Sequence, residues 1–169
     1  IRAVDSTLMA LQPDKIFKPE EELNIELTFS LPVAFTGGGT SDKPKLLVDG
    51  GTNRKLFIEN PSLVHYAEWI GAGSNLGQKG TYNLKHYFRY TVKSPRVENG
   101  KFIDGDQIND FDLYSNKALI LPGNVQIAAM GASSEVIIFT KVGEVEGSLS
   151  HDNNLVVDAR PSVLQHPEY

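Results

Sequence analysis

The chain has 169 residues and a formal net charge of −5, with 40% hydrophobic and 22% charged residues. This length suits one domain, and the composition excludes wholesale disorder and the concentrated basic surface that nucleic-acid binding requires. The absence of cysteine excludes disulfide bonds, cysteine-ligated zinc and thiol catalysis. No stretch approaches the ~20 apolar residues of a membrane-spanning helix, so we expect no membrane insertion and no nucleic-acid partner.

Alternating apolar and polar residues predict strands in the first third of the chain. Over residues 23–30 the alternation is strict, which indicates a half-buried strand, and Pro32 is expected to end it. Residues 45–48 and 54–58 flank Asp49-Gly50-Gly51, a sequence that tolerates the positive φ of a tight hairpin turn. These segments therefore predict one long strand followed by a hairpin.

A second long strand is predicted over residues 82–92, followed by a turn near Asn99-Gly100 and a returning strand at 101–103. Its inward face is expected to consist of Leu84, His86, Phe88, Tyr90 and Val92. Further short strands are expected at 111–114, 118–121, 125–129, 135–140 and 155–157. Many short strands separated by turn residues, without an amphipathic helix of three turns, predict an all-β, mostly antiparallel β-sandwich.

Several short motifs follow one another in a distinctive order. Phe-Lys-Pro-Glu-Glu-Glu-Leu at 17–23 precedes Pro-Lys-Leu-Leu-Val-Asp-Gly at 44–50, and Phe-Arg-Tyr-Thr-Val at 88–92 precedes Ala-Leu-Ile-Leu-Pro-Gly at 118–123. This series resembles the tandem Ig-like or cadherin-like repeats of large bacterial surface proteins of the adhesin type. The chain departs from the pattern in a longer segment at 60–82 and at 131–154, which has no clear counterpart.

The resemblance implies an Ig-like or cadherin-like sandwich at the bacterial cell surface. Residues 1–158 would form a single module with an N-terminal linker strand, and residues 159–169 a linker or tail toward the next repeat. The module would be non-enzymatic, a structural spacer or adhesive repeat with neighbouring repeats of the same chain as partners. The alternative is a carbohydrate- or protein-binding module that uses the segment 60–82, and a phage or fibre protein would share this composition.

The acidic segment 104–112 is the first candidate site. Ca²⁺ prefers oxygen ligands from flexible acidic loops, and the candidate ligands are Asp104, Asp106, Asp110 and Asp112. The segment does not follow the EF-hand pattern, and a solvated acidic turn is the alternative. By resemblance to repeats with calcium in their linkers, Asp5 and Asp158 are further candidates. Ca²⁺ is the only cofactor that the sequence suggests.

The aromatic residues of the longer segment are the second candidate site. Tyr66, Trp69 and Tyr82 would serve as a platform on which sugar rings stack, with a cell-surface glycan or protein as the partner. The alternative for Trp69 is a place in the core, where a lone tryptophan of a sandwich is usual. No Gly-x-Ser-x-Gly motif, metal-spaced histidine pair or complete phosphate loop is present, so we expect no enzymatic activity.

Overall fold

The computed structural model describes residues 1–11, 14–48, 65–103, 105, 107–108, 111–113, 117–131, 148, 152–153 and 155–158. In chain order the strands are β1 (Arg2–Val4), β2 (Ile16–Phe17), β3 (Glu22–Thr36), β4 (Lys45–Leu47), β5 (Tyr66–Ala72), β6 (Asn75–Leu76), β7 (Asn83–Thr91), β8 (Arg96–Glu98), β9 (Lys101–Ile103), β10 (Gln107–Ile108), β11 (Leu119–Ile120), β12 (Gln126–Ala129) and β13 (Val156–Asp158).

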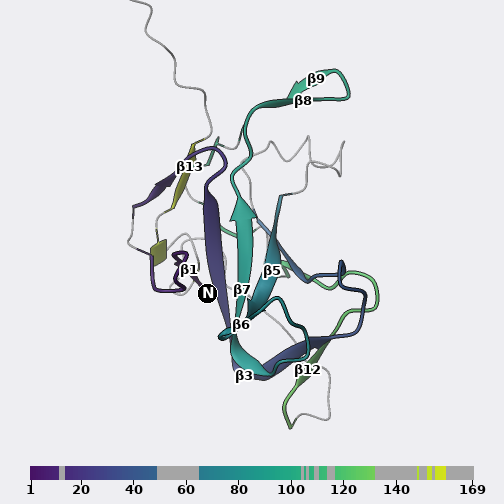
Figure 1. The fold of residues 1–169 in the computed structure, drawn as a ribbon. Coiled ribbons are helices and arrows are strands. Elements are labelled where there is room, and N and C mark those ends of the chain that lie inside the picture. Colours follow the sequence, from purple (N-terminus) through teal and green to yellow (C-terminus); the bar gives the residue numbers. More distant parts are fainter. Residues whose placement is uncertain are drawn as a thin grey trace, which may run out of the picture.

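These strands form a large sheet, a small sheet and a hairpin (Figure 1). The large sheet has the order β1-β3-β7-β5-β4-β11, with β12 paired to β3 and β6 paired to β5. The small sheet has the order β10-β13-β2, and β8 and β9 form the hairpin. Within the described ranges every strand pair is antiparallel except β13 with β2. The predicted all-β, mostly antiparallel fold is therefore confirmed.

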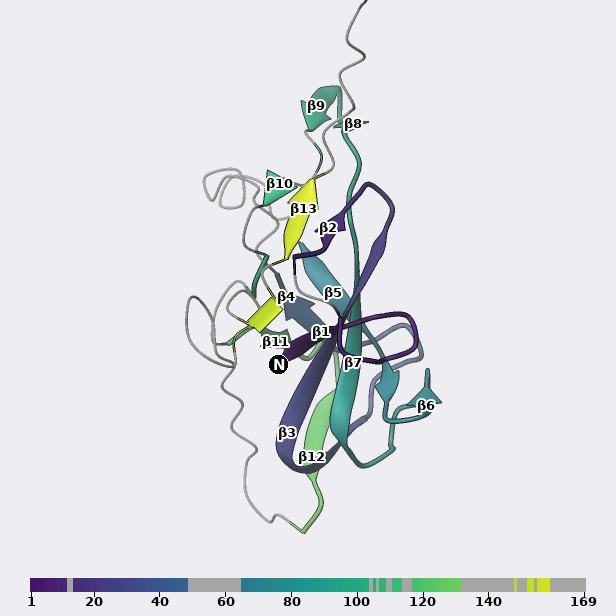
Figure 2. The ribbon, with the colours of Figure 1, turned by 90° about the vertical axis from the view of Figure 1, so that its left-hand side faces the viewer.

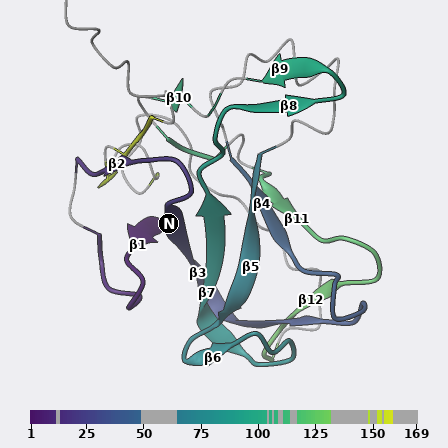
Figure 3. The same ribbon diagram turned by 45° about the horizontal axis from the view of Figure 1, so that its top comes forward.

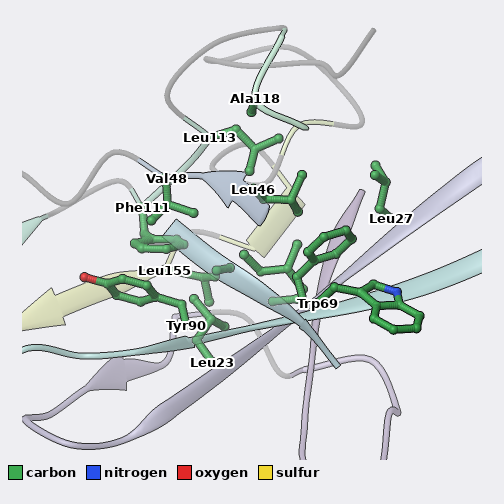
Figure 4. Close-up of a cluster of buried hydrophobic side chains, with 14 of the residues drawn as sticks. Leu23, Leu27, Leu46, Val48, Trp69, Tyr90, Phe111, Leu113, Ala118 and Leu155 are labelled. Atoms are coloured by element: carbon green, nitrogen blue, oxygen red, sulfur yellow. The ribbon is translucent and has the colours of Figure 1, made fainter. Parts of the chain in front are cut away.

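Both sheets contribute to one hydrophobic core, which gives the molecule its sandwich character. The small sheet (Figure 2) supplies Phe17 and Val157, and β3, β5 and β7 supply Leu23, Trp69 and Tyr90 among others (Figure 4). The core side of β7 carries His86, Phe88 and Tyr90, and Val92 follows directly after the strand; all four are buried as the alternation predicts. The remaining predicted member, Leu84, is exposed near the start of the strand.

A buried hydrogen-bond chain orders the aromatic part of this core. The indole N–H of Trp69 donates to Nδ1 of His86 at 3.2 Å, and Nε2 of His86 lies 3.0 Å from the carbonyl oxygen of Val33. Because an indole nitrogen only donates, Nδ1 must accept and the proton resides on Nε2. Burial lowers the pKa of His86, so the imidazole is neutral in this arrangement.

The prediction that Pro32 ends its strand is wrong, because β3 runs through Pro32 to Thr36. The pairing of β3 with β7 is irregular between Thr28 and Val33, and beyond it β3 pairs with β12. Proline lacks an N–H and is tolerated where a ladder is interrupted. Its carbonyl remains usable and accepts a 2.8 Å hydrogen bond from the Met130 N–H.

The polar face of β3 is also less exposed than strict alternation predicts. Glu26 is 2% exposed because Arg2, Lys85 and Tyr87 surround it. Arg2 Nε lies 2.9 Å and Lys85 Nζ 3.3 Å from its carboxylate, and the Tyr87 hydroxyl donates to it at 3.2 Å. Burial alone would raise the pKa of Glu26, but the hydrogen bond and charge of Arg2, with help from Lys85, hold it below its usual value.

This cluster predicts a measurable loss of stability for Glu26→Gln. The substitution removes the charge that Arg2 and Lys85 face, and we expect the free energy of unfolding to fall by about 1–3 kcal/mol. Glu22→Gln is the matched control, because Glu22 bonds Arg89 at 3.0 Å but is exposed; exposed pairs contribute at most about 1 kcal/mol. Equal losses in urea unfolding for the two variants would contradict the assignment of Glu26 as the centre of the cluster.

The turn predicted near Asn99-Gly100 is confirmed, with φ of 51° and 74° at the two residues. It joins β8 to β9, not β7 to β9, and the resulting hairpin projects from the sandwich (Figures 1 and 3). The hairpin turn predicted at 49–51 and the strands predicted at 54–58 and 135–140 lie outside the described residues, as does the tail at 159–169.

Candidate functional site

Most of the acidic segment predicted to bind Ca²⁺ lies outside the described residues, including Asp104, Asp106 and Asp110. Asp112 is buried, and its Oδ1 accepts a 2.7 Å hydrogen bond from the Leu113 N–H. Among the residues that the structure describes, no group of three or more His, Cys, Asp or Glu side chains has the geometry to hold a metal ion. The calcium hypothesis for this segment stays a prediction.

The two aspartates predicted to lie in linkers are found at the ends of different strands. Asp158 ends β13 and pairs in register with Gln107. Asp5 follows β1, and its Oδ1 accepts hydrogen bonds from the Thr7 N–H at 2.8 Å, the Thr7 hydroxyl at 2.7 Å and the Met9 N–H at 3.1 Å. These bonds, led by the one from the Thr7 hydroxyl, lower the pKa of Asp5. Asp5 therefore closes the tight loop that follows β1, in the manner of an Asx turn.

The three aromatic residues predicted as a sugar platform do not share one surface. Trp69 is 2% exposed and belongs to the core, so its indole is not available to a ligand. Tyr66 and Tyr82 are 40% and 41% exposed, but they lie at opposite ends of the β5–β7 pair. The antiparallel register, with Glu68 opposite Arg89 and Ala72 opposite His86, separates them.

Tyr66 lies instead in a shallow groove on the outer face of β5 and β7. The groove has a volume of about 330 Å³, and its lining includes Tyr66, Glu68, Ile70, Arg89, Thr91 and Lys93. Successive side chains of a strand alternate between its two faces. The even positions of β5 and the odd positions 89 and 91 of β7 therefore lie on the face opposite the core. A second hollow, lined by Glu20, Ser94 and Arg96 among others, shares Thr91 and Lys93 with the first. We call the two together the β5–β7 trough.

Exposed ion pairs engage two of the charged side chains that line the trough. The Arg89 guanidinium donates from Nε to Asn24 Oδ1 at 2.9 Å and lies 3.0 Å from the Glu22 carboxylate. Glu68 is paired with Lys43 at 2.9 Å. Arg89 and Glu68 therefore have partners within the protein.

Basic side chains accompany the trough. Lys45 Nζ lies 4.0 Å from the centroid of the Tyr66 ring, a cation–π contact. Lys93 lines both hollows and Arg96 lines the second, which also contains Glu20. The effect of Lys93 and Arg96 reaches His65, whose Nδ1 lies 2.8 Å from the Tyr90 hydroxyl. Burial first, and then the charges of Lys93 and Arg96, lower the pKa of His65 to about 4.

Sequence reasoning identified Tyr66 but missed the rest of the trough. Most of these residues come from β5 and β7, and the sequence of neither strand shows that the two pair with each other. The available signal was the alternation over residues 84–93, where the odd positions Lys85, Arg89 and Lys93 are basic while the even positions are aromatic or apolar. That pattern indicates a charged outer face, but only the sheet order brings Glu68 and Tyr66 beside it.

Comparison of the chain with known protein families, with curated proteins and with solved structures gives no match. The resemblance to surface-protein repeats therefore rests on the motif order in the sequence, and the structure adds the β-sandwich character. In the described part of the chain, no helix has the length and apolar character needed to cross a bilayer.

Proposed function

We propose that the chain is a non-enzymatic, extracellular module of a larger surface protein, and that it acts as an adhesive repeat by binding an acidic glycan in the β5–β7 trough. The sequence resemblance supports the class of module, and the β-sandwich is compatible with it. The single observation that carries the binding role is the exposed Tyr66 in a trough that Lys93 and Arg96 help to line, with Lys45 against the Tyr66 ring.

The chemistry of the trough favours a sugar that carries carboxylates or sulfates. A tyrosine ring offers an apolar surface with a polar tip, which suits the mixed character of a pyranose. Lys45, Lys93 and Arg96 provide cations along the path of a short oligosaccharide, while the net charge of the whole chain is −5. Such local positive charge on an acidic protein steers an anionic ligand to one face.

An adhesive role is proposed ahead of that of an extended spacer because the trough offers a place for a ligand. The Ala3 N–H donates to Asn153 Oδ1 at 2.9 Å, so β1 and the segment that precedes β13 lie side by side. That contact is compatible with an adhesive module and with a spacer. Ca²⁺ bound by the acidic segment 104–112 would be compatible with either role.

A glycan array that contains neutral, uronate, sialate and sulfated oligosaccharides tests the proposal. We expect binding to acidic members, weakened by added salt because exposed charges are screened. Tyr66→Ala should reduce the affinity about tenfold, which corresponds to about 1.4 kcal/mol, while the equally exposed Tyr82→Ala should leave it unchanged. Silence of the whole array would refute glycan binding, and equal losses for the two tyrosine variants would place the site elsewhere.

A further inference from the structure

Three backbone carbonyl oxygens converge on the side-chain ammonium of Lys79, a residue that is not part of the lining given for the β5–β7 trough. Lys79 Nζ lies 2.6 Å from Gly37 O, 2.7 Å from Gly39 O and 3.1 Å from Asp42 O. All three carbonyls belong to the loop between β3 and β4, whereas Lys79 belongs to the loop between β6 and β7. An ammonium has three donors, and each of them has an acceptor here.

The loop 37–42 is built so that its carbonyls face one point. Gly37 and Gly38 have φ of 72° and 65°, in the left-handed region that favours glycine. A Cβ at Gly37 would lie 2.4 Å from the backbone oxygen of Asn124, so the close approach also requires glycine. The Asp42 carboxylate accepts the Gly39 N–H at 2.8 Å, and the Asp42 N–H donates to Gly39 O at 3.1 Å, which closes the loop on itself.

Carbonyl dipoles that point at one another repel unless a cation lies between them. Rings of backbone carbonyls are the ligands that proteins use for K⁺, and an ammonium ion is close to K⁺ in size and charge. Ca²⁺ instead takes six to eight oxygen ligands, with carboxylates among them. The only carboxylate that the loop contributes is that of Asp42, which is engaged with the Gly39 N–H.

We propose that the loop 37–42 is a monovalent-cation site whose occupant is the ammonium of Lys79, and that K⁺ binds there when this ammonium is removed. The chain thereby supplies its own cation and uses it to join two loops. The neighbouring backbone supports this role, because the Gly80 N–H donates to Phe35 O at 2.8 Å at the end of β3. Neutralisation of Lys79, for example by acylation, would expose the site to solution cations.

Thermal melts of Lys79→Ala in KCl and in choline chloride at equal ionic strength test the proposal. In choline chloride we expect Tm to fall by about 2–6 °C relative to the wild type, which is the scale of shift for the loss of a few hydrogen bonds in a domain of this size. In KCl the variant should recover at least half of that loss, because a ligand that binds only the native state stabilises it. The controls are the wild type and Lys18→Ala, which alters an exposed lysine outside the loop. Each of them should have the same Tm in KCl as in choline chloride.

Amide hydrogen exchange gives a second measurement on the same samples. The Gly39 and Asp42 amides should exchange faster in Lys79→Ala than in the wild type, and KCl should slow them again. If Lys79→Ala does not melt cooperatively, Lys79→Gln is judged by the same criteria. Melting of the variant at the wild-type temperature, or an equal loss in KCl and choline chloride, would overturn the cation site while leaving glycan binding in the trough untouched.

Discussion

Replacement of Trp69 by alanine is expected to lower the free energy of unfolding by about 3–5 kcal/mol, the range for truncation of a large buried aromatic side chain. Trp69 is buried, its ring lies 5.8 Å from that of Phe35 in an edge-on contact, and its N–H donates to His86. Truncation opens a cavity and leaves His86 Nδ1 without its donor. Urea unfolding at neutral pH measures the loss.

Two further variants separate the causes of this effect. Trp69→Phe keeps much of the packing but removes the donor, and we expect a loss of about 1–3 kcal/mol, the cost of an unsatisfied buried acceptor. Tyr66→Ala, on the exposed face of the same strand, should cost less than about 1 kcal/mol. A loss for Trp69→Ala no greater than that for Tyr66→Ala would contradict the place of the indole in the core.

Acid is expected to destabilise the protein by about 3 kcal/mol through His65 alone. The pKa of His65 is lowered from 6.5 to about 4 in the folded state, so the unfolded state binds the proton more readily. The contribution of the neutral His65 imidazole to the free energy of unfolding is therefore fully present above pH ~6.5 and is lost as the pH falls to about 4. Urea unfolding at pH 7.5, 6, 5 and 4 follows this loss.

The variant His65→Gln isolates this contribution. Glutamine keeps a polar group for the Tyr90 hydroxyl but does not titrate. Other groups that respond to acid, His86 and Glu26 among them, are common to both proteins and cancel in the comparison. The wild type should lose about 3 kcal/mol more than the variant between pH 7.5 and 4; parallel profiles would show that the His65 imidazole does not gain its proton on unfolding.

The period-two pattern was sufficient to predict the fold class and the core side of β7. Positions 86, 88, 90 and 92 are all buried, and positions 88, 90 and 92 belong to the hydrophobic core cluster. The pattern fails where polar residues satisfy one another, as in the cluster of Glu26, Arg2 and Lys85. The alternation shows which side chains of one strand are apolar. Burial of the Glu26 carboxylate depends instead on cations from other strands, which the local sequence does not show.

The end of β3 and the trough were unpredictable for a related reason. Pro32 usually stops a strand, and here the strand continues because β12 pairs with residues 33–36 of β3 on the edge opposite β7. Tyr66, Trp69 and Tyr82 are all aromatic and lie within one segment of the sequence, but they are not close together in space. The alternation of β5 places Trp69 in the core, and the length of β5 and β7 separates the two tyrosines. The pairing of residues 68 and 89 is a property of the sheet order.

An NMR titration of the isotope-labelled protein with an acidic oligosaccharide tests the central claim most directly. A uronate trimer is the probe, and the neutral trimer of the same length is its control. Binding in the β5–β7 trough predicts saturable amide shifts concentrated at Tyr66, Glu68, Arg89 and Lys93 with the acidic probe, and much smaller shifts with the neutral one. Shifts confined to residues 104–112, or no saturable shift with either sugar, would contradict the account.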